Sequence, residues 1–165
     1  MAELPDFKAL HRKAFKAAFD HLDKNFPMDC NGQRMEVFSD ELCELSRIAN
    51  EVEDDPLKAE LFLALKCYVD KAALKWHDAT SLPDFKSLHK KAFRAALDYL
   101  EKNWFPVWDD QWWQERAKEL GPMYSIAENK NGNPLEAELY LAIYCYLEKA
   151  LKKWWPEEEA TECVS

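Results

Sequence analysis

The sequence predicts an all-α domain of six helices, built from two tandem, pseudo-symmetric three-helix repeats. The main observation is a duplication: residues 4–26, LPDFKALHRKAFKAAFDHLDKNF, return 78 positions later as residues 82–104, LPDFKSLHKKAFRAALDYLEKNW. Apolar residues in both copies recur at intervals of three and four, which is typical of amphipathic helices. The chain is 48% apolar and holds only three glycines, a composition that disfavours disorder and β-sandwich folds.

The length of 165 residues suits one compact domain. We predict this domain over residues 1–156, with repeat 1 at 4–78 and repeat 2 at 82–156. The repeats are expected to pack with approximate two-fold symmetry, like a homodimer whose chains have been joined. Residues 157–165 are acidic and small and lack a period, so they are predicted to form a flexible tail.

Three helices are predicted in the first repeat. The first covers about residues 5–25 and carries an apolar stripe on one face. The second is placed at about 35–51, after the turn expected at Asn31-Gly32, with a start near Gln33 or at a Ser39 cap as the alternatives. The third, at about 56–77, follows an Asp55 cap with Pro56 in the first helical position. It is apolar around almost its whole circumference, which indicates a central helix.

The second repeat follows the same order with one departure. Asp109 or Asp110 can cap its second helix, and Gly121-Pro122 is predicted to end that helix. A shorter helical piece is expected over about 123–128. The last helix begins at Asn133-Pro134, the counterpart of Asp55-Pro56.

Charge and apolar length limit the classes of partner. The net charge of -9 disfavours general nucleic-acid binding, which depends on neutralising phosphates. No stretch reaches the roughly 18 apolar residues that a membrane span needs, so we expect a cytoplasmic protein without a membrane partner. Five cysteines without paired spacing are expected to stay reduced. No motif indicates a cofactor or a nucleophilic elbow, which disfavours an enzyme.

Polar residues kept within the apolar faces form the first candidate site. They are His11, Glu60 and Tyr68 in the first copy, and His89, Glu138 and Tyr146 in the second. The favoured interpretation is that His11 hydrogen-bonds Glu60, or that each group finds a helix end, a tyrosine or water, and that the set fixes the register of the helices, since a buried polar group needs a partner. The alternative is a small-ligand or metal pocket in each half, conceivably catalytic. Two protein ligands per copy are too few for a metal site unless the copies meet, so metal is disfavoured.

A repeated row of cations is the second candidate. It consists of Lys8, Arg12, Lys13 and Lys16, and of their counterparts Lys86, Lys90, Lys91 and Arg94. In an acidic protein such a patch could seat a phosphate, an anionic ligand or an acidic partner. A solvated helix face is the favoured interpretation, because Asp20 and Asp98 continue the same rows.

The third candidate lies where the copies differ. Six of the seven tryptophans are in the second copy, and the segment 104–115 interleaves them with acids. Filling of a wider gap in the second repeat is one interpretation. Partly exposed tryptophan beside acid is also typical of a binding hot spot for a basic partner. The residues predicted to bind are Trp108, Asp109, Asp110, Trp112, Trp113 and Glu115.

These observations favour a non-catalytic protein-binding or regulatory module that acts through the acidic, tryptophan-rich surface of the second repeat. A basic partner would suit the charge of that surface. The alternative function is binding of a small ligand or a metal by the His/Glu set.

Overall fold

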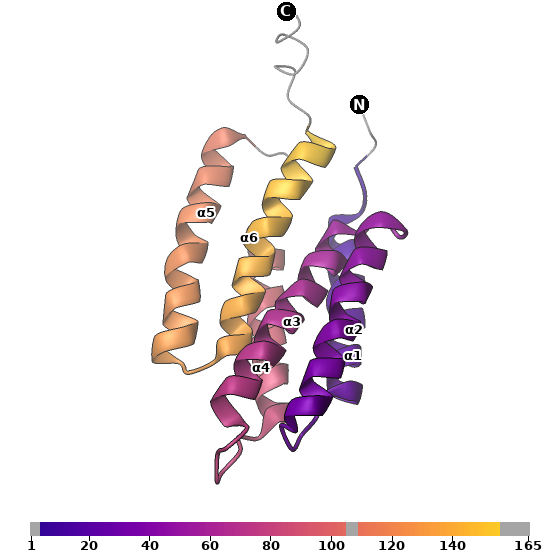
Figure 1. The fold of residues 1–165 in the computed structure, drawn as a ribbon. Helices are drawn as coiled ribbons and strands as arrows, with labels where there is room; N and C mark the ends of the chain where they lie inside the picture. The colour runs from indigo at the N-terminus through magenta and orange to yellow at the C-terminus, as the bar shows by residue number, and fades with distance from the viewer. Residues whose placement is uncertain (1–3, 105–108, 156–165) are drawn as a thin grey trace, which may run out of the picture.

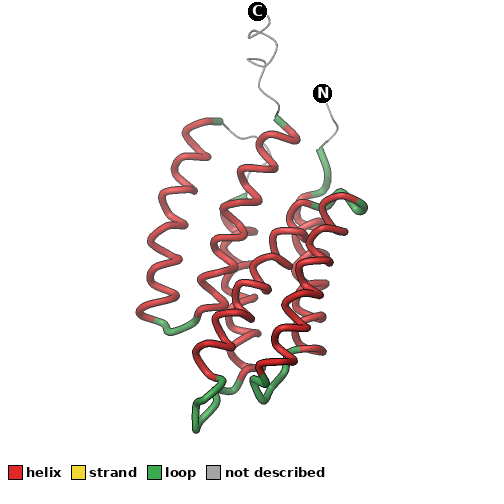
Figure 2. The backbone as a smooth tube through the Cα atoms, viewed as in Figure 1, coloured by secondary structure: helices red, strands yellow, loops and turns green. Residues whose placement is uncertain are grey.

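The computed structural model describes residues 4–104 and 109–155, and within these ranges the chain is helical and contains no strand (Figure 1, Figure 2). The predicted all-α, six-helix class is confirmed. The predicted tail, residues 157–165, lies outside the described residues. The six helices are α1 (Phe7–Asn25), α2 (Gly32–Glu51), α3 (Pro56–Trp76), α4 (Phe85–Asn103), α5 (Asp110–Ser125) and α6 (Pro134–Trp154), and a π-helical turn, Ile126–Lys130, precedes α6.

Side-chain caps begin these helices, and those of α3 and α6 lie at the residues that the sequence predicts. The carboxylates of Asp6 and Asp84 accept the first-turn N–H groups of α1 and α4. Asp55 and Asn133 cap α3 and α6, and in both helices a proline takes the first helical position. Each cap satisfies an N–H group that has no partner inside the helix.

Helices α3 and α6 form the centre of the molecule and pack against each other. Helix α2 flanks α3 and α5 flanks α6, so these four helices lie in one layer, while α1 and α4 lie behind them and contact each other (Figure 1). Helices α3 and α6 each bury side chains around most of their circumference, as predicted for central helices. None of the described helices combines the length and apolarity needed to cross a bilayer.

Two helix boundaries differ from the sequence prediction. Helix α2 begins at Gly32, three residues before the favoured start, because the Asn31 side chain accepts the N–H groups of Gln33 and Arg34 at 3.0 and 3.1 Å. The predicted stop at Gly121-Pro122 is wrong, because α5 continues through both residues to Ser125.

Packing around Pro122 explains why α5 does not stop there. Pro122 lacks the N–H that would bond the preceding turn, but its ring-fixed φ angle is compatible with a helix. Leu120 and Ala127, on either side of it, are both buried and hold the segment against the core. The backbone then adjusts through the π-helical turn, which ends with a 2.9 Å hydrogen bond from Asn131 N–H to the Ile126 carbonyl.

Candidate functional site

An open cleft between α5 and α6 is lined mainly by apolar and tyrosine side chains. We call it the tyrosine cleft; its volume is about 310 Å³. It is lined by Ala117, Leu120, Gly121, Tyr124, Tyr140, Leu141 and Tyr144. Leu141 is 44% exposed, so the cleft presents apolar surface to solvent. Apolar clefts with a few convergent polar groups are the usual form of a binding site.

One sequence difference between the copies changes a hydrogen bond at the tyrosine cleft. In the first half, the hydroxyl of Ser46 on α2 donates to the Ala59 carbonyl on α3 at 2.9 Å, which holds these helices close together. The counterpart of Ser46, 78 residues later, is Tyr124. A tyrosine is too long to make so short a link, and its hydroxyl reaches Glu138 at 3.1 Å instead.

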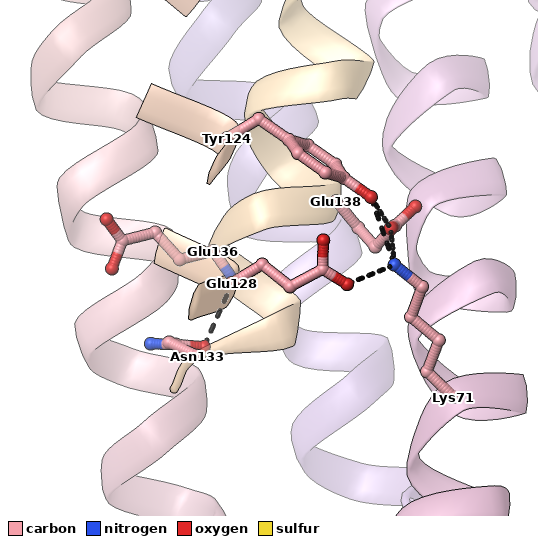
Figure 3. Close-up of polar contacts among 6 residues, drawn as sticks. All are labelled: Lys71, Tyr124, Glu128, Asn133, Glu136 and Glu138. Carbon is pink, nitrogen blue, oxygen red and sulfur yellow. Dashed lines mark hydrogen bonds and ion pairs between the residues drawn. The ribbon is translucent and has the colours of Figure 1, made fainter. Parts of the chain in front are cut away.

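The polar end of the cleft is a cluster around Lys71, shown in Figure 3. The Nζ atom of Lys71, from α3, lies 2.6 Å from Glu138 Oε2, 3.0 Å from Glu128 Oε1 and 3.0 Å from the Tyr124 hydroxyl. The Glu138 side chain is only 4% exposed. Lys71 therefore neutralises a buried carboxylate and joins α3 to the segment that follows α5.

The protonation states in this cluster make both Lys71 and Tyr124 hydrogen-bond donors. Burial by itself lowers the pKa of Lys71, but its hydrogen bonds to Glu138, Tyr124 and Glu128 outweigh burial and raise the pKa above its ordinary value. The bond from Lys71 lowers the pKa of Tyr124, yet burial and the Glu138 carboxylate outweigh it, so the net shift is upward. Near neutral pH the lysine is thus an ammonium group and the tyrosine a neutral phenol. Neither group is in the form that a base or a nucleophile requires.

A hydrogen bond on α6 holds a second cleft tyrosine in place. Asn133, at the start of the helix, accepts the Glu136 N–H at 3.1 Å (Figure 3). The Glu136 carboxylate accepts from the Tyr140 hydroxyl at 3.0 Å. The cleft thus carries carboxylates beside two of its tyrosines.

The predicted His/Glu set is brought together across the halves of the chain and not within each copy. His11 Nε2 lies 3.2 Å from the hydroxyl of Tyr146, and His89 Nε2 lies 3.1 Å from the hydroxyl of Tyr68. Sequence reasoning had placed each histidine with the tyrosine of its own copy. Helix α1 packs on α3 and α4 packs on α6, so the exchange is made by the tyrosine side chains, which reach from α6 to His11 and from α3 to His89.

The two glutamates of the predicted set pair with lysines instead of histidines. Glu138 bonds Lys71, and Glu60 bonds Lys149 across the α3–α6 contact. Sequence reasoning missed both lysines, because on a helix they look like ordinary surface residues. Among residues 4–104 and 109–155, no group of three or more His, Cys, Asp or Glu side chains could hold a metal ion.

Both paired histidines are fully buried among aromatic rings. His11 lies 4.6 Å from the Trp104 ring centre, and His89 lies 4.8 Å from that of Phe26. Burial lowers the pKa of His11 to about 3 and that of His89 to about 4, although the Asp23 carboxylate partly opposes the shift in His89. These neutral, enclosed imidazoles have the properties of core residues.

The tryptophans predicted to bind a partner are half-buried, and their rings pack against other aromatic side chains. Trp112 meets Trp104 edge-on at 6.2 Å, and the Arg116 guanidinium lies over its ring. Trp113 contacts Tyr144 with ring centres 6.0 Å apart, so it stands at one end of the tyrosine cleft. Trp108 lies outside the described residues.

The acids of the same predicted surface face solvent. Asp109, Asp110 and Glu115 are exposed, and Asp109 also caps α5 by accepting the Trp112 N–H at 2.7 Å. The structure therefore separates exposed carboxylates from inward-facing indoles on this helix. A signal for the cleft itself was present in the sequence: Tyr124 and Tyr144 replace Ser46 and Lys66 of the first copy.

The open space at Gly121 leads to a stability prediction. A methyl group added there meets no heavy atom within 4 Å. We expect Gly121→Ala to raise the free energy of unfolding by about 0.5–1 kcal/mol, because glycine inside a helix is less favourable than alanine by that amount. Urea denaturation measures the change. Gly132→Ala is the matched control and should destabilise, because Gly132 has a φ of +62°. A loss of stability in Gly121→Ala would contradict the open cleft.

Comparison of the chain with family models, with curated proteins and with solved structures finds no match.

Proposed function

We propose that this protein is a non-catalytic binding module that takes an apolar segment flanked by cations, from a partner protein, into the tyrosine cleft. The observation that carries the proposal is the open apolar cleft lined by Tyr124, Tyr140 and Tyr144. Tyrosine combines a large apolar ring with a polar tip and is enriched among the residues that dominate binding energy. The cleft stands at a place where the two halves of the chain differ in sequence.

Charge supports a cationic partner. The Glu136 carboxylate accepts from the hydroxyl of Tyr140, one of the cleft tyrosines, at 3.0 Å. Glu119, on the same helix as Leu120, accepts from the Tyr99 hydroxyl at 2.8 Å, and the ring of Tyr99 lies 6.2 Å from that of Tyr140. The whole chain carries a net charge of -9. Lys or Arg side chains that flank an apolar segment would be attracted to this rim.

Only part of the predicted tryptophan-rich surface is kept in this proposal. Trp113 extends the cleft at the Tyr144 end, so it is proposed to contact the partner. Asp109, Asp110 and Glu115 are exposed on the same helix and would attract cations of the partner during the encounter. Trp112, packed between Trp104 and Arg116, is assigned to the scaffold.

We infer that the scaffold behind the cleft is a joined pseudo-dimer of the two repeats. The paired contacts support this: His11–Tyr146 matches His89–Tyr68 when 78 is added to or subtracted from each residue number. The pairs Lys71–Glu138 and Lys149–Glu60 match in the same way. A self-complementary interface repeats each contact twice in this manner. One half is then free to diverge for binding while the shared core stays intact.

Binding of a designed peptide tests the proposal. The probe is a fluorescein-labelled helical peptide with a leucine stripe flanked by lysines, titrated in a fluorescence anisotropy assay. We expect the wild-type protein to bind it, and Gly121→Leu, which fills the cleft, to weaken binding by about tenfold or more. Gly32→Leu is the matched control, because a side chain there also meets nothing within 4 Å and lies on α2. Equal binding by both variants, or no binding by the wild type, would refute the proposal.

A further inference from the structure

The layer formed by α1 and α4 has a charge opposite to that of the whole chain. Each of these helices carries five Lys or Arg residues against two Asp or Glu residues, so the pair has a net charge of +6 in a protein of net charge -9. The cations of the repeated row are all exposed; they are Lys8, Arg12, Lys13, Lys16, Lys86, Lys90, Lys91 and Arg94. This face would therefore attract an anionic partner.

A groove with an aromatic floor runs between the two helices. We call it the α1–α4 groove; its volume is about 460 Å³. Its floor is formed by Phe15, Phe19, Phe93 and Leu97. The Phe93 ring centre lies 6.1 Å from that of Phe15 and 5.3 Å from that of Phe19. The groove thus has a floor of two buried and two half-buried apolar side chains between two rows of charge.

The walls of the groove carry four cations and one carboxylate. Arg12 and Lys16 stand on the α1 wall, and Lys90 and Arg94 stand on the α4 wall, with Asp98 as the carboxylate. The two cations on each wall are four residues apart, which places them one helical turn, about 6 Å, from each other. The α1–α4 groove therefore presents cations along both sides and not at one end.

The cations of the two walls differ in their ion pairs. Arg12 pairs with Glu101 at 2.7 Å, and Lys16 pairs with Asp20 at 3.3 Å, where both side chains are well exposed. An exposed pair of that kind contributes little to stability. Lys90 and Arg94 form no ion pair with any residue in the described ranges. Stability of the fold thus does not account for the α4 wall.

We propose that the α1–α4 groove binds an acidic amphipathic helix of a partner protein. The apolar stripe of that helix would pack on the phenylalanine floor, as a third helix packs on an antiparallel pair. Aspartates or glutamates on either side of the stripe, spaced by three or four residues, would meet the two rows of cations. This surface is distinct from the tyrosine cleft and takes a partner of opposite charge.

Two observations favour a helix over a lipid. A lipid headgroup would engage the cations at one point, whereas the four cations line both walls over a full turn. The floor is recessed, since Phe15 and Phe93 are only 3% and 6% exposed, so a planar bilayer surface would touch the rim and not the rings. A helix presents a ridge of side chains that can enter such a groove.

A charge-reversal experiment tests the proposal. The probe is a labelled helical peptide with a leucine stripe flanked by glutamates. We expect the wild type to bind it, and the Lys90→Glu/Arg94→Glu variant to weaken binding by about tenfold or more. The matched control, Lys24→Glu/Lys102→Glu, changes the charge equally at the far ends of the same helices and should retain binding. Circular dichroism and thermal unfolding verify that both variants fold.

Three results would overturn the proposal. They are no binding by the wild type, an equal loss in the matched control, and binding of vesicles containing phosphatidylglycerol in place of the peptide. Gly121→Leu separates this site from the tyrosine cleft, because it should weaken binding of the lysine-flanked peptide by about tenfold or more and leave binding of the glutamate-flanked peptide unchanged. Failure at one surface is then distinguishable from failure at the other.

Discussion

Lys71→Met is expected to lower the free energy of unfolding by about 3 kcal/mol, because removal of one member of a buried ion pair leaves the other charge uncompensated. Lys71 bonds Glu138, whose side chain is 4% exposed, and it also holds Glu128 and Tyr124. The value is placed at the lower end of the usual range since the Lys71 side chain is itself 37% exposed. Urea denaturation of the variant measures the loss.

Two further variants show whether the loss arises from the stranded carboxylate. Lys66→Met is the matched control on the same helix, because Lys66 pairs with the exposed Asp70; it should cost less than about 1 kcal/mol. The double variant Lys71→Met/Glu138→Leu removes both charges and should recover most of the stability. A loss in Lys71→Met no larger than that in Lys66→Met would contradict a structural role for the cluster.

Acidification from pH 7 to pH 5 is expected to lower the free energy of unfolding by about 4 kcal/mol through His11 and His89, since each contributes about 1.4 kcal/mol per pH unit once the pH is below the unfolded pKa of about 6.5. In the unfolded chain an imidazole takes up a proton below a pH of about 6.5. In the folded chain burial lowers the pKa values to about 3 and about 4, so both imidazoles stay neutral at pH 5. The stabilisation is therefore complete above pH 6.5 and is lost as the pH falls toward 4.

The slope of stability against pH separates this effect from others. His11→Gln removes one of the two imidazoles and should reduce the slope between pH 6.5 and 5 by about half. The wild-type protein offers an independent measurement, because NMR titration of the imidazole C–H signals should show no protonation of His11 or His89 above pH 5. Titration of either residue near pH 6 would show that it is not buried as described.

Most helix boundaries could be predicted because they depend on residues close together in the chain. Asp55-Pro56 and Asn133-Pro134 begin α3 and α6 as predicted, since a cap acts within three residues of its own position. The predicted helix end at Gly121-Pro122 was wrong because packing against the core outweighed the local helix-stop signal. Leu120 and Ala127 pack into the core and carry α5 past the proline.

The candidate site was less predictable than the helices. His11 and Glu60 could be recognised as polar residues within apolar faces, but not their partners, which lie 135 and 89 residues away. The tyrosine cleft depends on the distance between α5 and α6, which a helical pattern does not contain. The sequence signals for it were Tyr124 and Tyr144, which replace Ser46 and Lys66 of the first copy.

By itself the sequence determined the duplication, the six helices and the central place of α3 and α6, because apolar periodicity and capping are local properties. Tertiary structure alone decided that each histidine meets the tyrosine of the other half, that Lys71 and Lys149 neutralise buried glutamates, and that α5 stands open from α6. The physical reason is that these contacts arise from packing between helices far apart in the chain, where the shape of the whole core selects which side chains meet.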